Sequence, residues 1–228
     1  MTSKEHAVLF SGAMVRAILS GAKAQTRRVI KEQPFERSWS RHDHRIHYMA
    51  GRASNGDEVD GLWAYSASSG GEWMAKCPFG QPGDRLWVRE TTEADHDTSD
   101  GVALSRYSAD GAPVCYPVGT GDGFDGAIQH WQYSRDARPS IHMPRDACRL
   151  VLEITGVRVE RLQAISEADA LAEGIKAAHG RFTHNAGLQE CRTAAGAFEA
   201  LWTSTGGDWG SNPWVWVIEF KRVEVAGG

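Results

Sequence analysis

Hydrophobic and polar positions alternate most clearly in three stretches of the chain. Residues 85–91 (RLWVRET) place Leu86 and Val88 on one face, which is typical of a short, half-buried strand. Residues 148–159 repeat apolar side chains with a period of two over a greater length, which predicts a long or bent strand. The same alternation predicts a further strand over residues 214–225.

Three other stretches have the spacing of helices. Residues 13–20 repeat apolar side chains every three to four positions, and Gly21 is placed to end this helix. Ser166 is expected to cap a second helix, with an acidic residue three positions on, and Gly174 to stop it. A third helix is predicted over residues 194–202.

Two long stretches show neither period. Residues 32–82 and 92–137 are rich in Gly, Asp and Ser, and we interpret them as loop insertions. Strands outnumber the short helices elsewhere, which predicts a mainly β (α+β) fold: a small barrel or strongly curved sheet with two or three helices packed on it. We expect a single domain over residues 1–228. The expected barrel segments are 8–30, 83–91, 147–175 and 195–224.

The composition is that of an ordinary globular protein. Of 228 residues, 41% are hydrophobic and 24% are charged. The longest apolar run, Trp214–Ile218, is far below the roughly 18 residues that a membrane span needs, and the first apolar stretch is too short for a signal peptide. We therefore expect a cytoplasmic protein without a membrane partner. The isolated cysteines are expected to be free thiols.

A net charge of −4 argues against a duplex-DNA partner, because such proteins usually carry a strongly basic surface that neutralises phosphates. A local positive patch near the N-terminus could still bind a single nucleotide; it would comprise Arg16, Lys23, Arg27, Arg28 and Lys31. A histidine-rich segment lies in the first predicted insertion, without a cysteine pair, and we predict no metal site there. This segment contains His42, Asp43, His44 and His47.

Lys23 and Thr26 follow the first predicted helix at a spacing that suits chemistry. Residues three apart on a turn or a helical continuation can face the same side. A lysine in a partly desolvated cleft can lose its proton near neutral pH and act as a base toward a hydroxyl. The same segment also fits a solvated basic turn, and the spacing alone leaves both interpretations open.

The pattern Gly21-x-Lys23-x-x-Thr26-x-Arg28 resembles the GxKxxTxR signature of ASCH domains, which have a PUA-like β-barrel fold. Further segments are similar to the strand entry, the central strand, the following helix and the closing strand of that family, in the same order. Together they cover roughly half of the chain, which resembles the longer ASCH proteins of phages and prophages. These segments are residues 82–88, 151–162, 165–167, 173–175 and 214–221.

The best-defined enzymes of the ASCH family are small bacterial N4-acetylcytidine amidohydrolases, which use a lysine, a threonine and a glutamate. The resemblance implies Thr26 as the nucleophile, Lys23 as its activating base and Glu173 as an orienting acid or proton relay. Glu90, at the end of a predicted strand, is a second candidate for the acidic role. We expect Lys23, Thr26 and Glu173 to converge on one water-accessible cleft. The resemblance implies no metal or organic cofactor.

Further polar and aromatic residues are candidates for substrate contact, and each has a structural alternative. Arg28 could bind a phosphate or a base carbonyl as a fork donor, or form a surface salt bridge. A proline-stiffened loop presents His142 and Arg145, which could instead anchor that loop. Trp87 and Trp214 could stack on a base, or pack in the core. The complete set is Arg28, Glu90, Trp87, His142, Arg145 and Trp214.

The activity implied by the resemblance is removal of an N4-acyl group from a cytosine-type base or nucleoside. The expected partner is therefore a modified nucleoside or base, or RNA that contains one. A non-catalytic RNA-binding module that uses the same cleft is the main alternative. A metal-dependent ribonuclease is a third class, which a negatively charged chain without a carboxylate cluster disfavours.

Overall fold

The computed structural model describes most of the chain, in several segments. The described residues are 3–33, 45–49, 56, 61–68, 71–99, 101–119, 123–184 and 190–223. By its internal contacts the chain divides into two compact units. Unit 1 comprises residues 1–21, 85–153 and 221–228, and unit 2 comprises residues 22–84 and 154–220. The expectation of a single domain over the whole chain stays a prediction.

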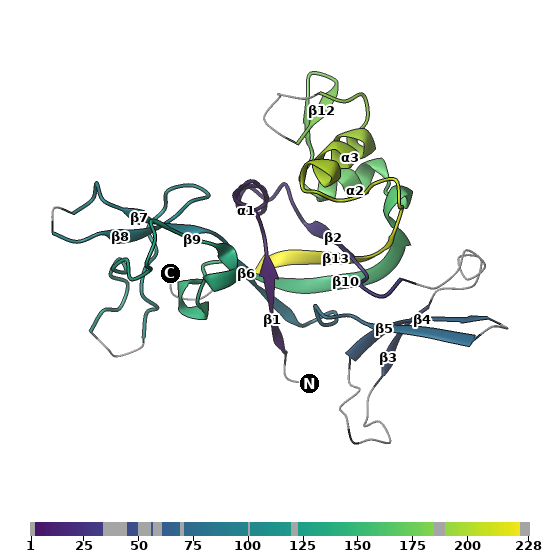
Figure 1. The fold of residues 1–228 in the computed structure, drawn as a ribbon, viewed down its shortest axis with the longest axis horizontal. Helices are drawn as coiled ribbons and strands as arrows, with labels where there is room; N and C mark the ends of the chain where they lie inside the picture. The colour runs from purple at the N-terminus through teal and green to yellow at the C-terminus, as the bar shows by residue number, and fades with distance from the viewer. Residues whose placement is uncertain are drawn as a thin grey trace. The chain divides into compact units, whose positions relative to one another are not determined.

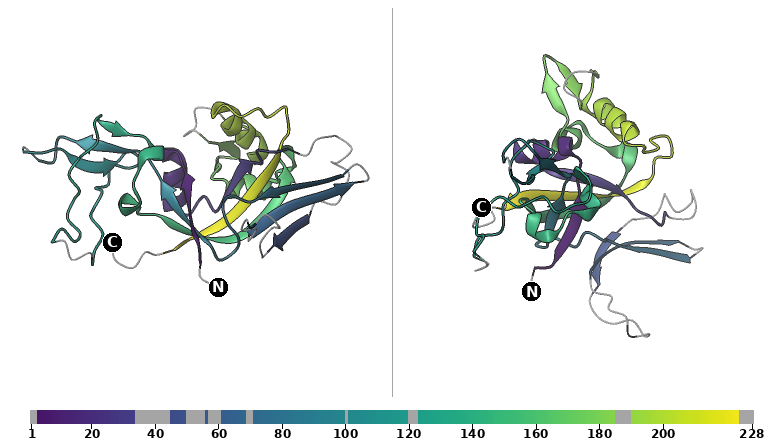
Figure 2. Two further views of the ribbon diagram at one scale, coloured as in Figure 1. Left: turned by 60° about the horizontal axis from the view of Figure 1, so that its bottom comes forward. Right: turned by 60° about the vertical axis from the view of Figure 1, so that its left-hand side comes forward.

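The largest sheet has five strands in the order β1-β6-β10-β13-β2 (Figure 1). Strand β1 is parallel to β6, whereas β10 is antiparallel to β6 and β13 is antiparallel to β2. The long strands β10 and β13 lie side by side and bend together (Figure 2). The bounds are β1 Glu5–Leu9, β2 Gln25–Val29, β6 Arg85–Arg89, β10 Val151–Arg161 and β13 Trp214–Val223.

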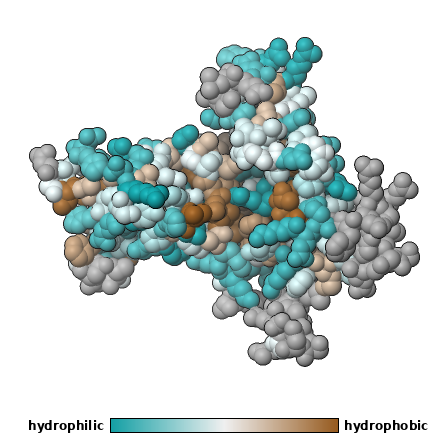
Figure 3. Space-filling view, in the orientation of Figure 1, coloured by the Kyte–Doolittle hydropathy of each residue, from teal (hydrophilic) through white to brown (hydrophobic). Residues whose placement is uncertain are grey.

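The described strands form no closed barrel, although the mainly β (α+β) class is confirmed. A barrel closes when its two edge strands pair, but β1 and β2 are opposite edges of the sheet and each has a strand partner on one side only. Both edge strands expose an apolar side chain, Leu9 and Val29. In Figure 3 hydrophobic side chains gather over this sheet, while hydrophilic ones predominate around it.

The two predicted loop insertions contain sheets, so this prediction was wrong for the described residues. In the second insertion the buried positions of two strands include Thr92 and Ser105, whose polarity hides the alternation. The first holds the antiparallel sheet of β3 (Arg45–Met49), β4 (Gly61–Ser68) and β5 (Gly71–Lys76). The second holds that of β7 (Thr92–Asp95), β8 (Leu104–Tyr107) and β9 (Ala137–Arg138). A separate hairpin pairs β11 (Lys176–Ala178) with β12 (Arg181–Thr183).

All three predicted helices are confirmed, and each begins at a hydroxyl cap. The side chains of Ser11, Ser166 and Thr193 accept hydrogen bonds from the main-chain N–H three residues on. None of the helices in the described part of the chain combines the length and hydropathy of a membrane span. The helices are α1 Gly12–Leu19, α2 Glu167–Ala172 and α3 Ala194–Ser204. Short 3-10 turns are η2 Ser140–His142, η3 Arg145–Ala147 and η4 Leu162–Ala164.

Unit 2 has a hydrophobic core between α2, α3 and strand β13. Phe198 of α3 and Val215 and Val217 of β13 are at most 3% exposed within this cluster. All residues from Trp214 to Ile218 are buried, so β13 has apolar neighbours on both of its faces. This packing fixes the end of α2 near β13, where the polar site described below is found.

Candidate functional site: a buried lysine–glutamate pair in unit 2

Lys23 lies in a short connection between α1 and β2 that is held by main-chain hydrogen bonds. Gly21 has a φ of +75°, a left-handed conformation that lets the chain turn after α1. The Ala24 N–H then donates to Ala172 O at 2.9 Å, and the Phe220 N–H donates to Ala24 O at 2.9 Å. The connection is thus tied to the end of α2 on one side and to β13 on the other.

The side chain of Lys23 contacts Glu173, which is 150 residues away in the sequence. Its Nζ donates to Glu173 Oε2 at 2.7 Å and to the carbonyl oxygen of Glu173 at 2.8 Å. The two residues are only 3% and 4% exposed. Glu173 is the C-cap of α2, where the helix dipole is unfavourable to a carboxylate and a cation beside it is favourable.

Arg27 is the second cation on Glu173. Its side chain is completely buried and donates to Glu173 Oε1 at 3.3 Å, whereas Lys23 binds the other carboxylate oxygen. Arg27 also pairs with Glu160 at 3.0 Å and with Asp169 at 3.4 Å. Both oxygens of Glu173 are therefore bound by a positively charged group.

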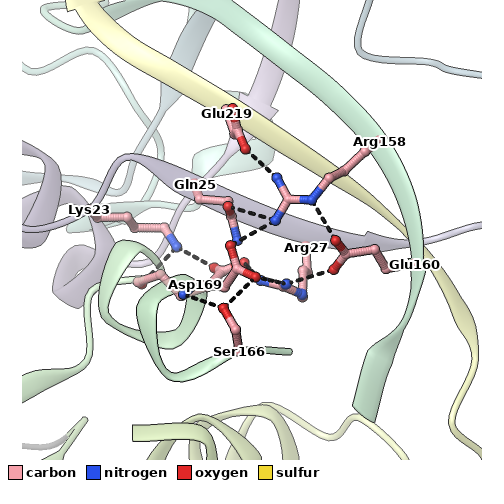
Figure 4. A network of polar contacts seen from close by, with 9 residues as sticks. Lys23, Gln25, Arg27, Arg158, Glu160, Ser166, Asp169 and Glu219 are labelled. Atoms are coloured by element: carbon pink, nitrogen blue, oxygen red, sulfur yellow. Dashed lines mark hydrogen bonds and ion pairs between the residues drawn. The ribbon is translucent and has the colours of Figure 1, made fainter. Parts of the chain in front are cut away.

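Arg158 of β10 forms an outer, partly exposed layer of the same network (Figure 4). It donates to Glu160 at 2.5 Å, to Asp169 at 2.7 Å and to Gln25 at 3.2 Å, and it pairs with Glu219 of β13. Gly156 leaves the room that Glu219 occupies, since a Cβ at this position would come within 2.8 Å of Glu219 Oε2. Charges of alternating sign thus extend from Lys23 outward to β13.

Burial is the main influence on the pKa of Lys23. Desolvation lowers the pKa of Lys23 below its ordinary 10.5, and Arg28 and Arg27 lower it further, while Glu173 opposes the shift. For Asp169, burial raises the pKa, but the Ser166 hydroxyl and the two arginines that bind it lower the pKa overall. The lysine is therefore the group of this network that is shifted toward its neutral form.

Thr26 is buried on β2, opposite Ile218 of β13, and is 3% exposed. Side chains alternate along a strand, which assigns Thr26 and Arg28 to one face of β2 and Gln25 and Arg27 to the other. Arg28 is half-buried, and desolvation lowers its pKa against the attraction of Glu173. Lys23, Thr26 and Glu173 are thus enclosed, in contrast to the predicted water-accessible cleft.

Glu90, the second candidate acid, belongs to unit 1 and has a different partner. It is 1% exposed, and Arg149 binds its two carboxylate oxygens at 2.9 and 2.8 Å. Arg149 also pairs with Asp110 at 2.8 Å. Of the two candidate glutamates, Glu173 is the one that contacts Lys23.

The candidates for substrate contact are divided between the two units. Arg28 and Trp214 belong to unit 2, where Arg161 lies over the Trp214 ring at 4.6 Å. Trp87, His142 and Arg145, like Glu90, belong to unit 1. Arg145 is anchored by Glu5 at 3.0 Å, as the structural alternative for this loop predicts.

The sequence-based reasoning missed most of the network around Glu173. One signal was available: charged residues at positions 158 and 160 lie two apart on a strand and so share a face. The missed residues are Gln25, Arg27 as a Glu173 partner, Arg158, Glu160, Asp169 and Glu219.

The four cysteines are free thiols, as the sequence predicts.

No metal centre is found in the described part of the chain, where no group of three or more His, Cys, Asp or Glu side chains could hold an ion. His42, Asp43 and His44 lie outside the described residues, and His47 is in β3. Independently of this, the polar groups of unit 2 could transfer protons. They comprise a buried amine of lowered pKa, Lys23, the carboxylate of Glu173 that it contacts, and the hydroxyl of Thr26 on strand β2.

The fold and this site together define a mainly β protein with a buried lysine–glutamate pair at the end of a short helix. Comparisons with protein-family models, curated proteins and solved structures give no match to this chain.

Proposed function

We propose that this protein is an amidohydrolase that removes an N4-acyl group from a cytosine-type base or nucleoside, and that its five-stranded sheet is a PUA-like one. The observation that carries the proposal is the 2.7 Å contact between Lys23 Nζ and Glu173 Oε2. These are the lysine and the glutamate that the resemblance to ASCH amidohydrolases had selected from distant parts of the sequence.

Lys23 acts as the general base in this proposal. A protonated lysine has three N–H donors. Its neutral amine keeps two of them, and a lone pair takes the place of the third. Glu173 accepts two hydrogen bonds from Nζ, through its carbonyl oxygen and through Oε2. These two bonds orient the neutral amine, and its lone pair takes a proton from the nucleophile.

Thr26 supplies the nucleophile. Its Oγ forms a bond with the acyl carbon while its proton moves to Lys23 Nζ. The C–N bond then breaks, and Lys23 returns the proton to the departing N4 amine. Lys23 then takes a proton from a water molecule that attacks the acyl–threonine ester, and gives it to the departing Thr26 Oγ, so that the hydroxyl is restored. The carboxylic acid is released and loses its proton to the solvent. Because Lys23, Thr26 and Glu173 are buried, this mechanism requires a local opening movement that admits the substrate.

Arg27 is a positioning residue for this chemistry. Without Arg27, each loss of the Lys23 proton would leave Glu173 as a buried carboxylate with no counter-ion, a state that is strongly unfavourable. Arg27 binds Glu173 Oε1 at 3.3 Å, and guanidinium groups in proteins keep their positive charge. Arg27 therefore keeps Glu173 neutralised while Lys23 exchanges its proton.

The direct test is incubation of the purified protein with N4-acetylcytidine and measurement of cytidine and acetate by chromatography. The proposal predicts equal amounts of both products from the wild type, and none above background from Thr26→Val, which keeps the side-chain shape but lacks the hydroxyl. Thr26→Ser, which keeps a hydroxyl, is expected to retain turnover. A correctly folded wild type that forms no cytidine would contradict the proposal.

A further inference from the structure

Unit 1 carries a cluster of arginines and aromatic rings that the Lys23 site does not use. The guanidinium of Arg138 lies 5.2 Å from the ring centroid of Trp131 and 5.1 Å from that of Tyr133. The Tyr133 ring in turn stacks on His142, with centroids 6.1 Å apart and planes at 29°. These residues come from β9, the segment before it and the turn after it.

The cluster continues through the neighbouring residue of that turn. Arg89 of β6 donates a hydrogen bond to Ile141 O and lies 5.3 Å from the centroid of Trp87. Arg145 lies 5.7 Å from the same ring. Ile141 is 55% exposed and the side chain of Arg145 is 47% exposed, so this end of the cluster is open to solvent.

The arginine–aromatic row defined by these contacts consists of Trp87, Arg89, Trp131, Tyr133, Arg138, His142 and Arg145. The row contains three arginines and no acidic residue, although the whole chain carries a net charge of −4. Of these arginines, Arg145 also pairs with Glu5 at 3.0 Å. A guanidinium that lies on a ring still presents N–H groups at its edge, and these can bind phosphate oxygens.

Rings interleaved with guanidinium groups are the chemistry that binds single-stranded nucleic acid. Unpaired bases stack on aromatic and guanidinium planes, and arginines pair with the phosphates that follow them. A duplex hides its bases, and the modest local charge gives little affinity for phosphates alone. We propose that the arginine–aromatic row of unit 1 is a binding surface for single-stranded RNA. The choice of RNA rests on the proposed function, since N4-acetylcytidine is a ribonucleoside.

The test is fluorescence anisotropy of the full chain with a labelled, unstructured 16-nucleotide RNA, and it requires no hydrolysis. Loss of one base stack costs about 1–3 kcal/mol, so Tyr133→Leu is expected to raise Kd by roughly 5- to 150-fold. Arg138→Gln is expected to raise Kd and to reduce the slope of log Kd against log salt by about 0.7, the contribution of one phosphate contact on a single strand.

Arg106→Gln is the matched control, because it removes one positive charge from β8, where Arg106 pairs with Glu93 at 2.8 Å outside the row. It should leave Kd within about twofold, and circular dichroism should show all three variants folded. Equal losses in Arg106→Gln and Arg138→Gln, no loss in Tyr133→Leu, or tighter binding of DNA of the same sequence would overturn the proposal. Binding without release of cytidine would contradict only the proposed hydrolysis.

Discussion

Among the described residues, each unit buries one glutamate almost completely, Glu90 in unit 1 and Glu173 in unit 2, and the two glutamates are bound by different cations. In unit 1, Arg149 binds both oxygens of Glu90 at 2.8–2.9 Å and also binds Asp110. In unit 2, Lys23 and Arg27 each bind one oxygen of Glu173. A guanidinium donates hydrogen bonds to both oxygens of a carboxylate and keeps its charge, whereas a lysine ammonium can give up a proton.

The pKa values of the two cations move in opposite directions for this reason. Burial lowers the pKa of Arg149, but its two carboxylate partners raise it above the ordinary value overall. Burial lowers the pKa of Lys23, and the adjacent arginines add to that shift, against a single carboxylate. Burial of an ion pair is therefore not by itself a sign of catalysis, since the identity and the surroundings of the cation decide its role.

The largest expected effect distinguishes the two ion pairs by their contribution to hydrolysis of N4-acetylcytidine. Lys23→Arg keeps the positive charge but cannot accept a proton, so its kcat for N4-acetylcytidine should fall by about 10²- to 10⁴-fold, the usual contribution of a general base. Glu90→Gln should keep kcat within about threefold. Steady-state kinetics check both. Substantial turnover in Lys23→Arg, or its loss in Glu90→Gln, would reverse the assignment of the two pairs.

The second expected effect is on the stability of unit 1. Arg149→Met removes the cation from a carboxylate that is 1% exposed, and breaking such a pair from one side costs about 3–5 kcal/mol. Urea unfolding monitored by tryptophan fluorescence measures this loss. The double variant Arg149→Met with Glu90→Leu should recover much of it, because the buried carboxylate is then removed, and Asp110, which also loses its partner, has a side chain that is 30% exposed. A single variant as stable as wild type would mean that the pair contributes nothing to the fold.

The pH dependence of stability should distinguish Lys23 from arginine. Because the folded pKa of Lys23 is lowered, the unfolded chain binds that proton more tightly. The free energy of unfolding of the wild type, relative to that of Lys23→Arg, therefore rises with pH between the folded pKa of Lys23 and its unfolded value of about 10.4. The gain is about 1.4 kcal/mol for each pKa unit of lowering. Parallel stability curves for the two proteins across this range would argue against a lowered pKa.

The smallest expected effect concerns the helix that presents Glu173. The Ser166 hydroxyl caps α2 by accepting from the Asp169 N–H at 3.1 Å, and it donates to the Asp169 carboxylate at 2.8 Å. Ser166→Ala should destabilise the protein by about 1 kcal/mol, as loss of an N-cap usually does. Thermal unfolding checks this value. Ser166→Asp, which restores a cap acceptor but adds a charge beside Asp169, should recover only part of the loss.

The elements that the sequence predicted are those in which apolar side chains occupy the buried positions. Strands β6 and β13 and the three helices belong to this group, and their predicted bounds lie within about two residues of the observed ones. Strand β2 was missed because its buried residues are Gln25, Thr26 and Arg27. Their polarity made the segment look like a solvated turn, whereas ion pairs and main-chain pairing to β13 hold it in the sheet.

The site was predictable only in part, for a related reason. The family resemblance selected Lys23 and Thr26 through a motif and Glu173 through an aligned segment, but no local pattern predicts that Arg27 pairs with Glu160, which is 133 residues away. Charged partners are brought together by the sheet, and their signs alone allow many pairings. The burial of Lys23, Thr26 and Glu173 was not predictable either. It depends on how α2 and β13 pack together, and the sequence patterns predict each element but not their packing.

The measurement that tests the central claim most directly is the pKa of Lys23 itself, which requires no substrate. Lysine side chains labelled with ¹⁵N and ¹³C can be titrated by NMR, and the Lys23 signal is the one that disappears in Lys23→Arg. If Lys23 is the base, its pKa should lie well below about 10.4 and should be higher in Arg27→Gln, since that neighbouring cation lowers it. A Lys23 that titrates at or above the value of a free lysine, and does not respond to Arg27→Gln, would contradict its role as a base.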